Sequence, residues 1–270
     1  RVVQDDFSHI LPEDDDGDFA ILSHNFNQMA NRIKLSLKAL QDDKLFLKDT
    51  ISDISHQLKT PLSSLMVFNE LMLKDEDMDP ASKTTFLERS NSQLERMEWL
   101  IVNLLKMARL ESGSIDFKDD YIPLIHPINI ALDTLSSKVS DKKIDIDVMG
   151  DLKNTFIYGD SDWLGEAFIN IIKNSIEHTP SNGKIYICLS HTPIFSQVEI
   201  KDTGEGISEE DLPHIFKRFY RSSSSVKVES VGIGLSLSKI IIEGHDGNIW
   251  VKSEKGAGTK FIITFLMNTV

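Results

Sequence analysis

The chain has 270 residues, of which 40% are apolar, so it is long enough to form two compact modules. Its formal net charge of −13 leaves no basic surface of the size that phosphate backbones require, so we expect no direct nucleic-acid ligand. The single cysteine, Cys188, excludes a disulfide framework or thiolate metal cluster within one chain and fits a reducing cytosol.

The first predicted element is a long helix from Leu22 to about Met72. Its apolar residues recur in alternating steps of four and three, which is the a/d seam of a coiled coil or helical bundle, interrupted once by the polar Lys44. The seam comprises Ile33, Leu37, Leu40, Leu47, Ile51, Ile54, Leu58, Leu65 and Met72.

A second helix is predicted from about Pro80 to Glu111, with Asp79 as its N-cap and Gly113 just beyond its end. Its seam comprises Leu94, Met97, Ile101, Leu104 and Ala108. One such helical hairpin has too little surface to bury both seams. We therefore predict a symmetric homodimer, in which two all-α hairpins close a four-helix bundle.

After Gly113 the pattern changes to that of an α+β domain. Helices are predicted at about Pro127–Ser140, Asp162–Glu177 and Gly234–Glu243. Strands are predicted at Lys143–Val148, Lys184–Leu189, Gln197–Lys201, Asn248–Lys252 and Thr259–Leu266. Between Asp211 and Val231, a stretch ending in Ser222–Ser225 is predicted to be a loop.

The first helix carries the segment SDISHQLKTPLSSL, and its heptad register places His56 at the position furthest from the seam. A lone histidine is usually an ordinary surface or core residue. Here, however, Pro61 follows five residues later and should kink the helix beside an imidazole that can accept a phosphoryl group.

These residues resemble the H-box of sensor histidine kinases. The resemblance implies that His56 is the phosphoacceptor and that Thr60 positions a water molecule when the same domain dephosphorylates its partner. The family usually has an acidic residue after the histidine, whereas this chain has Gln57. An amide can orient the imidazole but cannot act as a base, so autophosphorylation is expected to be slower or to lose its proton to water.

Four further motifs follow in the α+β domain, and each has an ordinary reading as a turn or helix face. Asn170 and Asn174 share one face of an apolar helix. The segment Asp202–Ile207 fixes a carboxylate beside glycines, and Gly232–Leu237 is a glycine-rich turn that opens a helix, where free N–H groups favour phosphate. Gly256–Phe261 leads into the last strand.

In this order and spacing the motifs resemble the N, G1, G2 and G3 boxes of the Bergerat-type ATP-binding domain, with an F-box at Phe216–Arg221. The resemblance implies that ATP and Mg²⁺ are the cofactors, that Asn174 binds Mg²⁺ and that Asp202 accepts from the adenine amino group. The remaining nucleotide-site residues that it implies are Asn170 and Arg218 near the phosphates, His178 near the adenine, Gly232 and Gly234 around the phosphate chain, and Gly204, Gly206, Leu235 and Thr259.

Two residues depart from the pattern. Glu177 stands where many relatives have a phosphate-contacting lysine, and Ser236 replaces the third glycine of the G2 box. The serine still allows a helix, whereas the glutamate weakens the assignment of the phosphate contacts nearby.

The segment Asp16–Ile33 resembles the second helix of a HAMP signal-relay module. That resemblance, with a start at Arg1 rather than Met, implies a fragment of a bacterial cell-membrane protein: its cytoplasmic portion, tied to the membrane by a missing upstream part. We expect a partial HAMP module and signalling helix at residues 1–47, a dimerisation and phosphotransfer domain at 48–114, and a catalytic ATP-binding domain at 115–270.

The resulting prediction is a protein-histidine kinase that phosphorylates His56 and transfers the phosphate to an aspartate of a response regulator receiver domain, with phosphatase activity toward that regulator. One alternative is a Bergerat-type ATPase similar to gyrase, mismatch-repair or heat-shock chaperone families. Those families place a water-activating glutamate where this chain has Asn170. The other alternative is a degenerate kinase that docks or dephosphorylates a regulator, which Gln57, Glu177 and Ser236 support.

Overall fold

The computed structural model describes residues 18–74, 78–222 and 231–267. Three predicted features lie partly outside these residues. They are the start of the HAMP-like segment, the middle of the hairpin turn and most of the serine run. The chain divides into two compact units, Arg1–Gln93 and Leu94–Val270.

The first unit contains helix α1 (Asp18–Lys74) and the beginning of helix α2 (Pro80–Glu111). Both predicted helices are confirmed, and α1 continues as a helix on either side of Pro61. The Asp79 carboxylate accepts a hydrogen bond of 2.9 Å from the backbone N–H of Ser82, as an N-cap should. Hydrogen bonding from the side chain of Ser82 and from its backbone lowers the pKa of Asp79. The rings of Phe68 and Phe86 lie 5.8 Å apart and join the two helices of the hairpin.

The second unit contains a five-stranded mixed sheet with strand order β2-β4-β5-β7-β6. Strands β2 (Asp145–Gly150) and β4 (Lys184–His191) are parallel, whereas β4, β5 (Phe195–Asp202), β7 (Gly258–Leu266) and β6 (Gly247–Glu254) pair in antiparallel fashion. In the central strands alternate residues are buried, because only one face of the sheet is covered.

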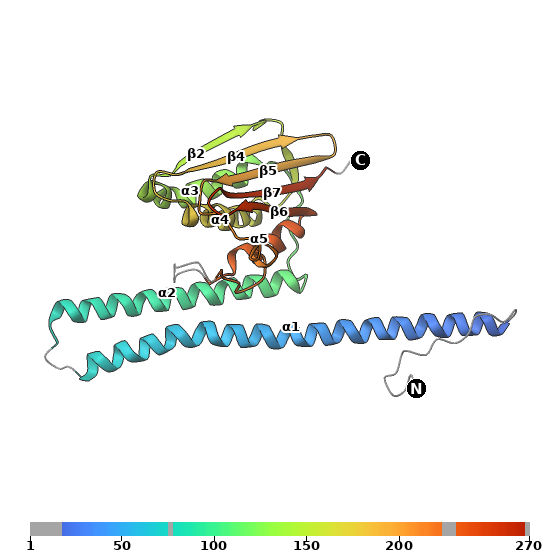
Figure 1. The fold of residues 1–270 in the computed structure, drawn as a ribbon, viewed down its shortest axis with the longest axis horizontal. Coiled ribbons are helices and arrows are strands. Elements are labelled where there is room, and N and C mark those ends of the chain that lie inside the picture. Colours follow the sequence, from blue (N-terminus) through green and yellow to red (C-terminus); the bar gives the residue numbers. More distant parts are fainter. Residues whose placement is uncertain (1–17, 75–77, 223–230, 268–270) are drawn as a thin grey trace. The chain divides into compact units, whose positions relative to one another are not determined.

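Helices α3 (Ile125–Lys142), α4 (Ser161–His178) and α5 (Gly234–Glu243) form a layer on that covered face (Figure 1). Between this layer and the sheet lies an apolar core whose largest fully buried side chains include Phe168, Phe261 and Phe265. The two-layer arrangement confirms the predicted helical region followed by an α+β domain.

Two short strands were absent from the sequence predictions. Strands β1 (Asp120–Pro123) and β3 (Phe156–Gly159) pair in antiparallel fashion as a separate two-stranded sheet, and a 3-10 turn (Leu212–His214) lies in the predicted loop. Strands of four residues are too short to show a clear alternation of apolar and polar residues. Tyr121 stacks on Phe156 with ring centroids 4.8 Å apart, a cross-strand contact that sequence periodicity does not reveal.

Candidate phosphoacceptor and nucleotide site

His56 lies on α1 in the first unit, and its side chain is exposed. Gln57 beside it is half-buried. Thr60 is exposed one turn further along the helix, and its hydroxyl donates to the backbone carbonyl of His56 at 3.3 Å. An exposed imidazole can approach a phosphoryl donor without desolvating other groups. The structure therefore places these three predicted residues on neighbouring positions of one helix.

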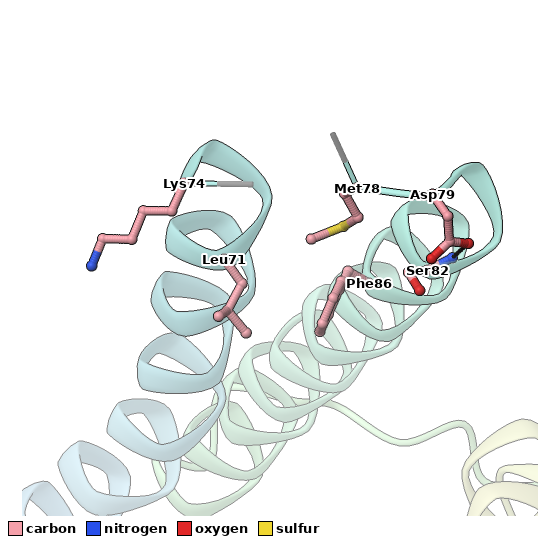
Figure 2. A pocket seen from close by; sticks show the side chains of 6 residues that line it. All are labelled: Leu71, Lys74, Met78, Asp79, Ser82 and Phe86. Carbon is pink, nitrogen blue, oxygen red and sulfur yellow. Dashed lines mark hydrogen bonds between the residues drawn. The ribbon is translucent and has the colours of Figure 1, made fainter. Parts of the chain in front are cut away.

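The tip of the hairpin in the same unit encloses a hollow of about 400 Å³ (Figure 2). It is lined by Leu71, Lys74, Met78, Asp79, Ser82 and Phe86. The backbone N–H of Ser82 donates to the Asp79 carboxylate there, at the start of α2. None of the residues with predicted chemistry lines it.

In the second unit, α4 carries the two asparagines of the predicted N-box. The helix is fixed at its start by Asp160, whose carboxylate accepts from the backbone N–H groups of Asp162 at 3.0 Å and Trp163 at 3.3 Å. Asn170 and Asn174 are half-buried. The Asn170 Nδ2 group is shielded from solvent and has no hydrogen-bond partner among the described residues. A buried amide without a partner is costly, and a bound ligand would supply what it lacks.

Asp202 ends β5 and is 2% exposed. Its Oδ1 atom accepts from the backbone N–H groups of Gly204 at 2.9 Å and Thr259 at 3.0 Å. Burial raises the pKa of Asp202, and the two backbone donors oppose that rise. Because Oδ1 is already engaged by two donors, Oδ2 is the oxygen that remains for a further hydrogen bond.

The end of α4 is joined to the G1 segment. His178 Nδ1 lies 2.6 Å from Oε1 of Glu205, and the backbone N–H of Glu205 donates to the carbonyl of His178 at 3.3 Å. Gly204 is needed at this junction, since a Cβ there would lie 2.5 Å from the His178 carbonyl oxygen. His178 is thereby held beside the residues that follow Asp202.

Lys142, the last residue of α3, fixes the same end of α4. Its Nζ donates to the backbone carbonyls of Ile176 at 2.6 Å, Glu177 at 2.9 Å and Thr179 at 2.8 Å. These carbonyls belong to the last turn of α4 and the residue after it, where helices lack internal donors. A cation at this position also interacts favourably with the helix dipole.

The predicted G2 turn lies against Asn170. A Cβ on Gly234, the first residue of α5, would lie 3.2 Å from Asn170 Oδ1, so a glycine permits this close approach. Leu235 follows within the first turn of α5, and the Ser236 hydroxyl donates to the carbonyl of Ile233 at 2.8 Å. The serine is thus accommodated in the helix, as predicted.

Gly206 and Gly232 both have positive φ angles, 69° and 79°. A Cβ on Gly206 would lie 2.0 Å from the backbone oxygen of Glu254, so no other residue fits there without a shift of the backbone. Gly232 accepts a backbone hydrogen bond of 2.8 Å from Phe219, which ties the predicted F-box to the G2 turn.

Two charged residues near the predicted phosphate contacts have protein partners. Arg218 is half-buried and forms an ion pair with Glu111, and burial lowers the pKa of its guanidinium. Glu177 lies 3.9 Å from Lys173, four residues earlier on α4. Arg218 is therefore already engaged by a carboxylate in this structure.

The structure brings most of the predicted nucleotide-site residues together around α4. Asn170 contacts the G2 turn, and Asp202 joins the G1 and G3 segments through Gly204 and Thr259. Sequence reasoning missed Lys142, Glu205 as the partner of His178, and Ser175. Ser175 has a buried hydroxyl without a protein partner among the described residues, and its place directly after Asn174 was the only available signal.

Two protein families match this chain. The family described as His Kinase A (phospho-acceptor) domain matches residues 46–113, and the family described as histidine kinase-, DNA gyrase B- and HSP90-like ATPase matches residues 159–269. The two matches include His56 and every predicted nucleotide-site residue. Among the described residues, no helix has the length and hydropathy of a membrane span.

The chain is also similar to whole sensor kinases. It is 30% identical to sensor histidine kinase YclK of Bacillus subtilis over 97% of this chain and 56% of that protein. It is 32% identical to heme sensor protein HssS of Staphylococcus saprophyticus over 98% of this chain and 55% of that protein. The chain thus spans little more than half of the length of these relatives.

Solved structures show the same fold. Histidine kinase AdeS of Acinetobacter baumannii gives a TM-score of 0.64 at 21% identity, over 79% of this chain and 98% of that one. Histidine kinase ThkA, solved in complex with response regulator protein TrrA, gives 0.67 at 23% identity, over 84% of this chain and 63% of that one. With a phosphoacceptor module followed by an ATPase module, the chain belongs to the sensor histidine kinases of two-component systems.

Proposed function

We propose that the chain transfers the γ-phosphate of ATP to His56 and then to an aspartate of a response regulator, and that it also dephosphorylates that regulator. One observation carries this proposal. A buried carboxylate whose two backbone donors both use Oδ1, Asp202, and a buried amide, Asn170, whose Nδ2 has no partner among the described residues lie beside the glycine turns next to α4, in a chain that exposes a histidine on α1.

Asp202 Oδ2 would accept from the adenine amino group, and His178 would border the same part of the nucleotide. Asn170 Nδ2 would donate to a phosphate oxygen near the turn at Gly232 and Gly234, where Leu235 follows and the first N–H groups of α5 are available. The remaining members of the site, Gly204, Gly206 and Thr259, hold Asp202 and the G1 segment in place.

Asn174 would contribute its side-chain oxygen to Mg²⁺. No group of three or more histidine, cysteine or acidic side chains suited to a metal lies within the described part of the chain. The ion would therefore be held by this amide and by the phosphates themselves, and when bound it neutralises charge on the transferred group.

At the acceptor, the His56 imidazole provides a nitrogen lone pair that forms the new P–N bond, while the bond to the leaving ADP oxygen breaks. The ring must also lose its proton. Gln57 can hold the ring by a hydrogen bond but cannot take up a proton, so the proton passes to water. In the separate phosphatase reaction, Thr60 would position the water molecule that hydrolyses the aspartyl phosphate of the regulator.

The proposal of a dimer is supported by the apolar surface of α1. Its seam residues include Leu40, which is 63% exposed, and Ile51, which is 56% exposed, and an identical hairpin could bury both. We propose a homodimer with residues 48–114 as the dimerisation and phosphotransfer domain, residues 115–270 as the catalytic domain and residues 1–47 as a partial HAMP module and signalling helix. A membrane anchor upstream of a cytoplasmic kinase would accord with the sensor proteins among its relatives.

The response regulator is proposed by analogy with ThkA, whose structure contains response regulator protein TrrA. The regulator's receiver aspartate would accept the phosphoryl group from His56. Gln57 and Glu177, which depart from the family pattern, favour a second candidate: a degenerate kinase that docks or dephosphorylates the regulator without labelling itself.

Incubation of the chain with γ-labelled ATP and Mg²⁺ tests these readings. Transfer to histidine predicts protein label that is lost in acid and kept in alkali, absent from both His56→Ala and Asn174→Ala. His56→Ala should still bind nucleotide, because the histidine is not part of the nucleotide site. A wild-type chain that binds ATP but acquires no label, with its upstream sensor present and stimulated, would refute the kinase proposal and leave the degenerate kinase.

A further inference from the structure

His245 lies just beyond the end of α5, and its ring joins that end to the start of α4. Its Nδ1 group lies 2.7 Å from the carbonyl oxygen of Ile241, so it must donate there, and Nε2 accepts from the backbone N–H of Asp160 at 3.1 Å. These two bonds require a neutral ring with its proton on Nδ1. Burial, which lowers the pKa of His245, favours the same neutral form.

The segment between α2 and β1 reaches the same ring. Phe117 from this segment packs against His245 with ring centroids 4.2 Å apart, and it lies 5.9 Å from the Trp163 ring of α4. Beside it, the Lys118 backbone N–H donates to the Asp160 carboxylate at 3.3 Å. The chain that leaves α2 is therefore attached to the end of α5 and the start of α4 at one place.

Helices α4 and α5 run antiparallel, because the contacts between them pair early residues of one with late residues of the other. From one end to the other, the pairs are Asp160 with His245, Ala167 with Ser238, and Asn170 with Gly234. The last pair belongs to the proposed phosphate site. A helix of ten residues is a rod about 15 Å long, so a shift of α5 at its His245 end also changes the approach of Gly234 to Asn170.

We propose that His245 is a positioning residue for nucleotide binding: it sets the register between α4 and α5, and Phe117 couples the end of α2 to that register. The register keeps Asn170 close to the turn at Gly234, where the phosphates would lie. The base would lie at Asp202, which is on β5 and on neither helix. This inference rests on the proposed nucleotide site, and it assigns to His245 an effect on the phosphates and not on the base.

Two substitutions separate the roles of the two ring nitrogens. The amide oxygen of His245→Gln can reach the place of Nε2 and accept from Asp160, whereas the shorter His245→Asn can donate to Ile241 but cannot reach Asp160. The test measures dissociation constants of the 270-residue chain for ATP with Mg²⁺ and for adenosine, which carries no phosphate. His245→Asn should weaken ATP about three- to tenfold, the range for one neutral hydrogen bond, and leave adenosine within about twofold. His245→Gln should keep both ligands within about twofold of wild type.

Phe117→Ala gives the same test at a half-buried position without changing His245. It should also weaken ATP and leave adenosine unchanged. In the double variant with His245→Asn, the loss of ATP affinity should be smaller than the product of the two single losses, because both side chains act at one contact. His191→Asn is the matched control, since His191 ends β4 and lies 3.4 Å from Asp151, and it should leave both affinities unchanged.

Equal losses of ATP and adenosine in His245→Asn would assign the ring to general stability. Full ATP affinity in that variant, failure of His245→Gln to retain it, or fully multiplicative losses in the double variant would likewise overturn the inference. Failure of the wild-type chain to bind either ligand would instead refute the nucleotide site on which the inference rests.

Discussion

Replacement of Asp202 by asparagine separates recognition of the base from stability of the fold. The asparagine carbonyl can occupy the place of Oδ1 and keep both backbone donors, Gly204 and Thr259. Its Nδ2 then replaces Oδ2 and presents a donor to the amino group of adenine. The complex with ATP loses a hydrogen bond to a charged acceptor and instead has two donors facing each other. Together these changes should reduce the binding free energy by about 2 to 4 kcal/mol, which corresponds to about 30- to 700-fold weaker ATP binding.

The same change should not destabilise the fold at neutral pH. Burial raises the pKa of Asp202 above its ordinary value of 3.8. A carboxyl with a raised folded-state pKa contributes stability that is fully present below the unfolded pKa and is lost as the pH rises through the folded-state pKa. Above the folded-state pKa the wild type has lost that contribution. Asp202→Asn carries no ionisable group, so it should melt no lower than the wild type at pH 7.

Calorimetric titration with a non-hydrolysable ATP analogue and Mg²⁺, together with thermal unfolding, checks both parts. Asp147→Asn, an exposed residue of β2, is a control that removes the same charge and should leave affinity unchanged. Affinity of Asp202→Asn within about threefold of wild type, or a marked fall in its melting temperature at pH 7, would contradict the reasoning.

Three other variants test neighbouring parts of the account. Gln57→Glu should raise the single-turnover rate of His56 phosphorylation by supplying a base, and an unchanged or lower rate with intact ATP binding would remove that argument. Gly206→Ala should lower the free energy of unfolding, measured with denaturant, by more than about 2 kcal/mol, because its φ is 69° and its Cβ would lie 2.0 Å from the backbone oxygen of Glu254. Gly256→Ala is the control, since its φ is 86° but no atom lies within 4 Å of the added Cβ, and it should cost about 1 kcal/mol. Lys142→Met should lower the melting temperature and weaken ATP binding, because it removes the donor to the carbonyls at the end of α4. Lys142→Arg should restore part of the melting temperature and part of the ATP affinity. Full ATP affinity in Lys142→Met would exclude a positioning role.

Local patterns predicted the elements of this chain well. The long helix and the second helix at Pro80–Glu111 follow from heptad spacing and from end signals such as Asp79, and α5 has the predicted bounds. The short strands β1 and β3 could not be predicted, because four residues carry too little periodicity and their pairing joins segments more than thirty residues apart. The predicted roles of His56, Asn170, Asn174 and Asp202 remain predictions that the labelling and binding experiments will test.

The residues that sequence reasoning missed share a physical character. Asp202 and Asn170 stand in motifs that can be recognised from a few consecutive residues, whereas Lys142 meets carbonyls more than thirty residues away and Glu205 meets His178 across 27 positions. Such long-range contacts leave no local signature in one sequence. They nonetheless determine where the ligand-facing groups lie, since His178 sits in the turn that Lys142 fixes, one turn beyond Asn174. The local motifs therefore name the groups that would meet ATP, whereas the contacts made by Lys142 and Glu205 hold the end of α4 that carries His178. Substitutions at these two positions are expected to change ATP affinity while every motif stays intact.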